Sequence, residues 1–86
     1  MPHSTQLHQI PQGTWATVRH VLPDTHGQED TLMLRLLELG FVPGELVKIM
    51  AAVPGRDPIA VRVGHTTFGL RRYEAERVCV EVTPHG

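Results

Sequence analysis

Three kinds of side chain in this sequence could take part in chemistry: histidine, cysteine and arginine. Imidazole nitrogens bind transition metals, a thiolate beside a histidine can act as a nucleophile, and a guanidinium group can bind carboxylate or phosphate through two parallel hydrogen bonds. The chain has six histidines, one cysteine at Cys79 and an adjacent pair of arginines at Arg71 and Arg72. Their spacing indicates which of these chemistries to expect.

The histidines do not follow the spacing of a metal site. Neither a CxxC nor an HExxH motif occurs, and half of the histidines lie near the chain ends, at His3, His8 and His85. The candidates for a site assembled by folding are His20, His26 and His65, but solvated surface histidines explain the same pattern and are favoured. We therefore expect no required cofactor, and at most weak or adventitious binding of Fe²⁺ or Zn²⁺.

No motif predicts catalysis. The chain contains neither a Walker loop nor GxGxxG, which argues against an intrinsic NTPase. Cys79 lies in an alternating run that is typical of a buried or half-buried thiol. Because no paired acid and base accompanies it, we expect the protein not to be an enzyme.

The arginine pair has two explanations. Arg71 and Arg72 could pair locally with Glu74 and Glu76, and exposed pairs of that kind contribute roughly 0–1 kcal/mol. Alternatively, they could contact an acidic or phosphate-bearing partner. The residues alone favour the local pairs.

Composition narrows the class of protein. A chain of 86 residues holds one small domain, and its net charge of −1 without a basic stripe argues against nucleic-acid binding. The most apolar segment, residues 32–42, is interrupted by Arg35 and Glu38 and is too short to cross a bilayer. With no signal peptide pattern and a single cysteine, the sequence predicts a cytoplasmic protein without membrane insertion.

The first half of the chain predicts a strand followed by a helix. Residues 1–12 lack a periodic pattern and are expected to form a flexible tail. Residues 14–22 alternate, which places Ala16, Val18 and His20 on one face of a strand. From about Asp30, a plausible N-cap, apolar residues recur at helical spacing as far as Gly40.

The junction after this helix has a recognisable stop signal. Gly40 suits a left-handed residue after the last turn, and Phe41 is placed to fold back on that turn. Pro43 and Gly44 then predict a tight turn. The strand that follows spans residues 45–53, and its expected inner face consists of Val47, Ile49, Ala51 and Val53.

The second half predicts three more short strands. Residues 59–63 alternate, and residues 64–70 turn at Gly64 and carry Phe68 and Leu70 at a period of two. Residues 77–82 place Val78, Val80 and Val82 on one face. The segment RRYEAE is expected to form a single 3-10 turn before the last strand. About five short strands are best satisfied by a sheet that curls into a small barrel, with the helix covering an open end.

Three segments of the sequence resemble the FeoA family, the small cytosolic component of bacterial ferrous iron transport. They are LRLLELGFVPGELVKI, DPIAVRV and GLRRYEAERVCVEV, and the resemblance runs from about Gly13 to Val82. It implies a mainly β, SH3-like barrel at residues 13–82 between tails at 1–12 and 83–86. It also implies that the domain acts by binding a protein partner, the cytosolic region of the FeoB transporter.

The family signature falls mostly on residues with an architectural explanation. The matching positions are Leu37, Gly40, Pro43, Gly44, Asp57, Pro58, Ile59, Leu70, Arg71 and Ala75. The loop before Asp57 departs from the family pattern, because this chain has Pro54-Gly55-Arg56 where Pro-Leu-Gly is usual.

The expected partner-binding surface combines the helix, the junction and the arginine pair. Its residues are Leu39, Gly40, Phe41, Pro43, Gly44, Arg71 and Arg72. Leu34 and Leu39 of the helix, together with Met50, are candidates for exposed apolar positions. Two other functions stay open, a stand-alone metal-binding or iron-delivery protein and a regulatory module of a metal-dependent repressor, and so does a homodimer formed through a free sheet edge.

Overall fold

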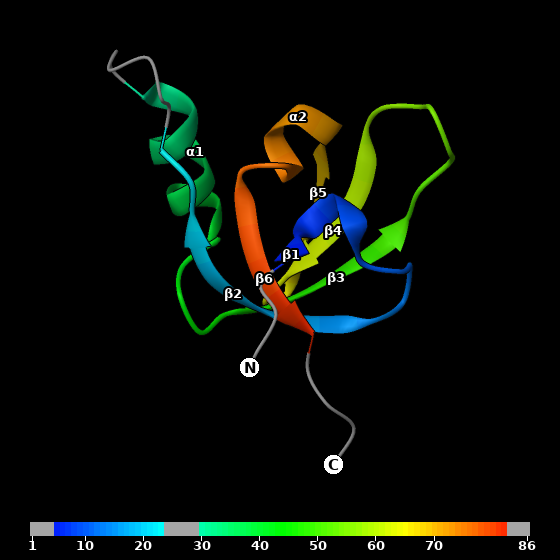
Figure 1. Ribbon diagram of the computed structural model, residues 1–86, viewed down its shortest axis with the longest axis horizontal. Coiled ribbons are helices and arrows are strands. Elements are labelled where there is room, and N and C mark those ends of the chain that lie inside the picture. The colour runs from blue at the N-terminus through cyan, green and yellow to red at the C-terminus, as the bar shows by residue number, and fades with distance from the viewer. Residues whose placement is uncertain (1–4, 24–29, 83–86) are drawn as a thin grey trace.

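The computed structural model describes residues 5–23 and 30–82, which form a strongly curled antiparallel sheet with two helices (Figure 1). The strands pair in the order β1-β6-β2-β3-β4-β5, so β1 and β5 are the two edges of the sheet. The elements in chain order are β1 (Thr5–Gln6), the 3-10 helix η1 (Leu7–Gln9), β2 (Trp15–Val21), α1 (Thr31–Leu39), β3 (Leu46–Ala51), β4 (Ile59–Val63), β5 (Thr66–Leu70), α2 (Arg72–Ala75) and β6 (Val78–Val82).

The core fills the concave side of the sheet. Alternating side chains of the strands point into it, as the period-two pattern of the sequence predicts. Its fully buried members include Val18, Val47, Ile59, Val61, Leu70, Val78 and Val80, with Leu36 and Phe41 added from α1 and its junction. The predicted mainly β fold, with one longer helix between the first two predicted strands, is confirmed.

Helix α1 begins and ends as its sequence predicts. The Asp30 Oδ1 atom accepts a hydrogen bond from the Met33 N–H at 3.0 Å, which satisfies one free donor of the first turn. Gly40 closes the helix at φ 113°. The Phe41 N–H donates to the Leu36 carbonyl at 3.0 Å, and the Phe41 ring is buried in the core. This pairing is the Schellman arrangement and fixes the direction in which the chain leaves the helix.

The turn at Pro43–Gly44 is joined to the sheet by hydrogen bonds. The Glu45 N–H donates to the Val42 carbonyl at 3.0 Å, and Gly44 adopts φ 93°, as the third residue of a type II turn requires. The Gly44 N–H donates to the Val18 carbonyl at 2.8 Å, and the Val18 N–H donates to the Glu45 carbonyl at the same distance. The junction therefore aligns β3 with β2.

Two register shifts overturn part of the predicted inner faces. The pairing of β2 with β6 shifts between Val18 and His20, so Val21 is buried and His20 is exposed. The pairing of β3 with β4 shifts after Ile49, and Ala51 lies exposed beyond the shift. A bulge adds one residue to a strand and moves the following side chains to the opposite face, which simple alternation does not anticipate.

Two strand ends also differ from the predicted faces. Val53 lies beyond the end of β3 and is 57% exposed. Val82, the last residue of β6, is 42% exposed although Val78 and Val80 of the same strand are buried. Val53 thus lies outside the sheet, and Val82 is the terminal residue of its strand.

The predicted flexible tail over residues 1–12 is wrong for residues 5–10. Thr5 and Gln6 pair with Val80 and Cys79 of β6, and this pairing gives the described sheet six strands rather than about five. Leu7 and Ile10 are buried in the core. These two apolar residues, three positions apart, cover an end of the core, while β1 covers the edge that β6 would otherwise expose. The domain therefore begins before Gly13.

The segment before β6 is a short α-helical turn instead of the predicted 3-10 turn. The Glu76 N–H donates to the Arg72 carbonyl, four residues earlier, at 2.9 Å. The Glu74 side chain stabilises the start of this turn, because its Oε1 atom accepts the Arg71 N–H at 2.8 Å.

The burial of Leu7 yields a direct test of the corrected domain boundary. We expect Leu7→Ala to lower the free energy of unfolding by about 2–4 kcal/mol, because the substitution leaves a cavity in the core. Urea denaturation monitored by circular dichroism measures this change. The control Val53→Ala removes an exposed side chain and should cost less than about 0.5 kcal/mol. Equal stability of Leu7→Ala and the wild type would contradict the packing described for η1.

Candidate functional site

The two helices lie at the same end of the curled sheet (Figure 1). An ion pair joins them. Arg35 of α1 contacts Glu74 of α2 through its Nη1 atom, which lies 2.8 Å from the Glu74 Oε2 atom. Glu74 is a buried carboxylate with 4% of its surface exposed. Its two oxygens are used separately, since Oε1 accepts the Arg71 N–H and Oε2 accepts from Arg35. Both interactions compensate the cost of burying the charge.

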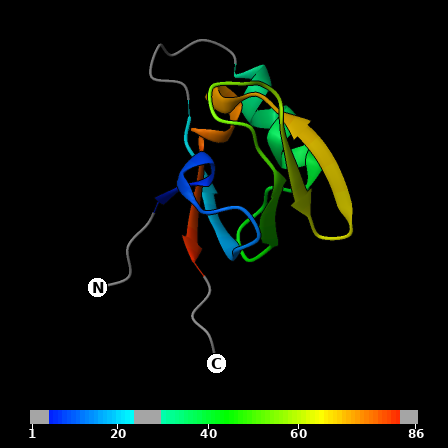
Figure 2. The ribbon, with the colours of Figure 1, turned by 90° about the vertical axis from the view of Figure 1, so that its right-hand side faces the viewer.

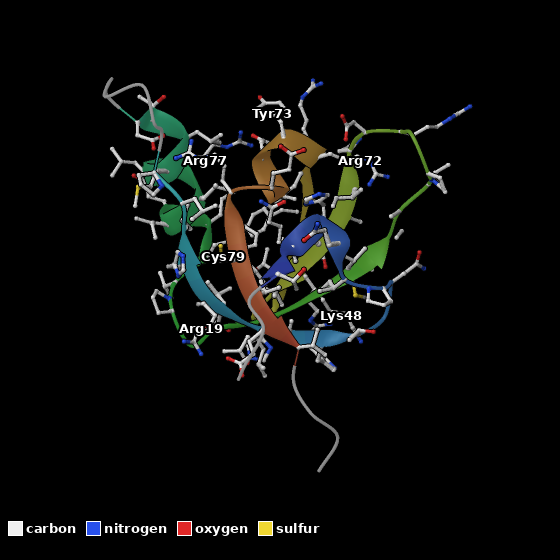
Figure 3. The ribbon with its side chains drawn as sticks, in the orientation of Figure 1. Arg19, Lys48, Arg72, Tyr73, Arg77 and Cys79 are labelled. Atoms are coloured by element: carbon white, nitrogen blue, oxygen red, sulfur yellow. The ribbon has the colours of Figure 1, made fainter. Side chains whose placement is uncertain are left out.

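Arg77 connects three further segments at this end of the molecule (Figure 3). Its Nη1 atom donates to the Asp30 Oδ1 atom at 2.9 Å, and its Nε atom donates to the Leu22 carbonyl at 2.8 Å. Asp30 is also the N-cap of α1. Arg77 therefore joins the start of α1, the segment after β2 and the start of β6, which makes its role structural.

The two adjacent arginines have different roles. The Arg72 N–H donates to the Asp57 Oδ1 atom and the Arg72 Nη2 atom donates to the Val53 carbonyl, both at 2.9 Å. Arg72 thus attaches the loop after β3 to α2. The Arg71 guanidinium has no acceptor among the described residues, although the Arg71 backbone is held by Glu74. The local side-chain pair predicted between Arg71 and Glu74 is therefore replaced by the Arg35–Glu74 pair.

A polar pocket of about 340 Å³ opens beside these residues. Its walls come from α1, α2, the loop after β3 and the edge strand β5. The lining residues are Arg35, Asp57, Pro58, Gly69, Arg71, Tyr73 and Glu74. Two arginines and a tyrosine thus meet two carboxylates at one small opening, and guanidinium donors that are not already bonded could bind an anionic group there.

The expected partner-binding residues do not form one surface. Figures 1 and 2 place the segment between α1 and β3 at the opposite end of the sheet from α2, where Arg71 and Arg72 lie. Phe41 is fully buried and so cannot contact a partner directly, and Leu39 packs against the core. The exposed part of this junction consists of Val42, Pro43, Gly44 and Leu46.

The outer face of the sheet also carries exposed apolar residues. Trp15 of β2 is opposite Lys48 of β3, and the Lys48 Nζ atom lies 4.4 Å from the ring centroid. Met50 is 39% exposed, in agreement with its predicted outward direction, and Leu34 of α1 is 54% exposed. The alternation of β2 places Trp15 outward, but only the strand pairing shows that it meets Lys48.

Two of the three candidate metal ligands lie in the described residues, on different elements of the sheet. His20 and His65 are exposed, on β2 and in the turn between β4 and β5, and His26 lies outside the described residues. Within residues 5–23 and 30–82, no group of three or more histidine, cysteine, aspartate or glutamate side chains could hold a metal ion. Cys79 is buried, as its alternating strand predicts. No helix in the same ranges is long and apolar enough to cross a membrane.

Comparisons with known proteins agree on one family. The model of the FeoA domain matches residues 5–82. A crystal structure of Stenotrophomonas maltophilia FeoA complexed with zinc, described as possibly acting as a bacterial ferrous iron transport activating factor, is 45% identical with a TM-score of 0.78 and 88% coverage of both chains. The solution structure of iron(II) transport protein A from Clostridium thermocellum is 30% identical, with a TM-score of 0.77 and coverage of 92% of this chain and 46% of that one.

Two other matches are parts of larger proteins, one related in sequence and one similar in fold alone. A Porphyromonas gingivalis Fe(2+) transport protein A/Fe(2+) transporter FeoB fusion protein is 38% identical over 48 residues, which are 56% of this chain and 6% of the fusion protein. The match therefore spans only a small part of that curated relative. A manganese-dependent transcriptional repressor shares the fold alone, with 18% identity, a TM-score of 0.78 and coverage of 96% of this chain and 44% of the repressor.

The double role of Glu74 yields a test of how α1 and α2 are held together. We expect Glu74→Ala to lower the free energy of unfolding by about 1–3 kcal/mol, because it removes the bond to the Arg71 N–H and the partner of Arg35. Glu74→Gln should cost less, since its amide oxygen can still accept the backbone bond. Thermal unfolding compares both with Glu76→Ala, a change at an exposed position of the same segment. A Glu74→Ala protein as stable as Glu76→Ala would exclude a stabilising role for this carboxylate.

Proposed function

Because the chain belongs to the FeoA domain family, we propose that it is a cytoplasmic accessory protein of ferrous iron transport that docks on the cytosolic region of a FeoB transporter. In this role it is not an enzyme and requires no cofactor of its own. It alters the iron flux or the GTP hydrolysis of its partner by binding.

The fusion protein of Porphyromonas gingivalis carries this proposal. There, a segment related to this chain is part of one polypeptide with a FeoB transporter. Covalent linkage holds two domains at a high effective concentration, and this is useful when they work in contact. A separate chain must achieve the same proximity through a docking surface with affinity of its own.

Docking changes the activity of the transporter only through differential binding. A docked domain shifts the equilibrium between two states of its partner by the difference in its affinity for them. This small domain is suited to such a role because packing, hydrogen bonds and an ion pair join its core, the junction after α1 and the end that carries the two helices. The sign of the effect, activation or inhibition, follows from which state of the partner binds it better.

We assign the docking contact to the helical end, which we define as Arg35, Arg71 and Tyr73. Tyrosine and arginine are the residue types that most often dominate binding energy in protein interfaces. Tyr73 is 58% exposed, and α2 presents it beside Arg72 at the end of the molecule (Figure 3). The exposed part of the junction, at the opposite end, is the competing surface.

Substitutions at the two ends separate these surfaces. We expect Tyr73→Asp to weaken binding to the purified cytosolic region of FeoB by about tenfold or more, because a central aromatic contact is replaced by a charge. Val42→Asp places the same charge on the junction, where Val42 is 40% exposed, and should leave binding nearly unchanged. Calorimetric titration gives both affinities, and a GTPase assay shows whether the effect on the partner is lost in parallel. The reverse pattern would assign docking to the junction.

The alternative, a metal-binding or iron-delivery protein, has its own test. The Stenotrophomonas maltophilia relative is complexed with zinc, which gives this alternative its support. Because His20 and His65 join no group of three potential ligands in residues 5–23 and 30–82, we expect weak binding of Fe²⁺ at most. Anaerobic calorimetry with Fe²⁺ measures this binding, and tight binding at one site would favour iron delivery.

A homodimer through a free sheet edge stays a prediction that analytical ultracentrifugation can check.

A further inference from the structure

We propose that the polar pocket at the helical end binds the carboxylate of an acidic side chain in an extended segment of a protein partner. The proposal rests on the proposed function for the identity of that partner, and it adds the chemistry of the contact. The pocket is the space of about 340 Å³ between α1, α2, the loop after β3 and β5.

Two guanidinium groups with free donors line the pocket. The Arg71 side chain donates to no residue in the described part of the chain, so its whole donor set is available. Arg35 uses its Nη1 atom for Glu74, and 57% of its side chain is exposed. Its Nε and Nη2 atoms have no acceptor within residues 5–23 and 30–82. A carboxylate entering between these groups can form charge-assisted hydrogen bonds with both.

The two carboxylates in the pocket wall already accept hydrogen bonds, Glu74 through both oxygens and Asp57 through one. The Oδ1 atom of Asp57 accepts the Arg72 N–H. Because these two carboxylates face two arginines, the formal charge of the lining sums to zero, and the attraction for an anion comes from the free guanidinium donors. A carboxylate carries one negative charge, whereas a phosphate group carries about 1.5–2 at pH 7 and would be repelled more strongly by Glu74 and Asp57. A lining of zero net charge therefore suits a singly charged carboxylate better than a phosphate.

The edge strand gives the pocket a place for a peptide backbone. Gly64 at φ 57° forms a two-residue turn between Val63 and Thr66, which makes these two residues a hydrogen-bonded pair. Hydrogen-bonded and non-hydrogen-bonded pairs alternate along an antiparallel ladder, so Gly69, opposite Ala60, directs its N–H and C=O away from β4. No backbone or side chain in the described segments bonds to these groups. An extended peptide can pair with Gly69 while an acidic side chain enters the pocket.

A second copy of this chain is a poor occupant. The free edges of the sheet are β1 and β5, and simple association of copies pairs these edges with each other. Residues 1–23, which include β1, contain no aspartate or glutamate, and neither does β5. Edge pairing between copies would therefore bring no carboxylate to Arg35 and Arg71. The occupant expected from charge complementarity is a different protein with an acidic extended segment.

The first experiment titrates the labelled protein with the purified cytosolic region of FeoB from the same organism and follows backbone amides by NMR. We expect the largest shifts at Gly69, Arg71 and Tyr73, and a loss of affinity of about tenfold or more for Arg71→Glu. Arg71→Lys should retain part of the binding. The control is Arg56→Glu, which makes the same charge change at an exposed loop residue outside the pocket lining and should change affinity less than about twofold. Binding of FeoB with shifts only elsewhere, or equal losses for both arginine variants, overturns the pocket and leaves the proposed function intact.

The second experiment tests the pocket independently of FeoB. A random peptide library displayed on phage is selected against the wild-type protein and against Arg71→Glu. Enrichment of peptides with a fixed acidic position, lost in Arg71→Glu and abolished by an Asp→Asn or Glu→Gln change in the peptide, supports the pocket even if FeoB does not bind. No acidic enrichment overturns it. Displacement of the selected peptides by low concentrations of inorganic phosphate would also overturn it, because the ligand chemistry would then be phosphate.

Discussion

The left-handed backbone at Gly40 is the constraint on which the rest of the fold depends. A residue with a side chain is strained at φ 113°, although a Cβ atom there would make only ordinary contact with Val63 at 3.5 Å. By reversing the chain at this point, Gly40 directs Phe41 into the core and leads the backbone to Gly44, which bonds to Val18. A nine-residue helix is marginal by itself, and this junction holds α1 against the sheet. The position of Arg35, and hence the pocket, follows from it.

The sequence predicted most local structure because local signals determine it. Asp30 and Gly40 mark the ends of α1 by hydrogen bonding and by backbone preference, and the alternating valines of β4 and β6 mark strands. The errors share a different origin. The bulges after Val18 and Ile49, and the pairing of Thr5 with Val80, depend on partners that are distant in sequence. No pattern within a short window contains that information.

The candidate site could be predicted only in part from the sequence, for the same reason. The sequence singled out Arg71 and Arg72 but could not distinguish them, because the distinction depends on Asp57 and Val53 of a remote loop. Arg35 was interpreted only as a polar position of the helix. Its pairing with buried Glu74 brings it into the pocket, and 39 residues separate the two in the chain. Conversely, Phe41 was predicted to lie on the partner-binding surface because of its position in the junction, but its ring is buried in the core.

The pairing of β1 with β6 has a consequence for how this domain can be joined to other chains. Thr5 lies opposite Val80, so the first and last described strands are neighbours in the sheet. A domain with adjacent ends can be inserted into a loop of a larger polypeptide, or circularly permuted, with a short linker and little strain. Such geometry suits a domain whose relative in Porphyromonas gingivalis is part of a longer polypeptide.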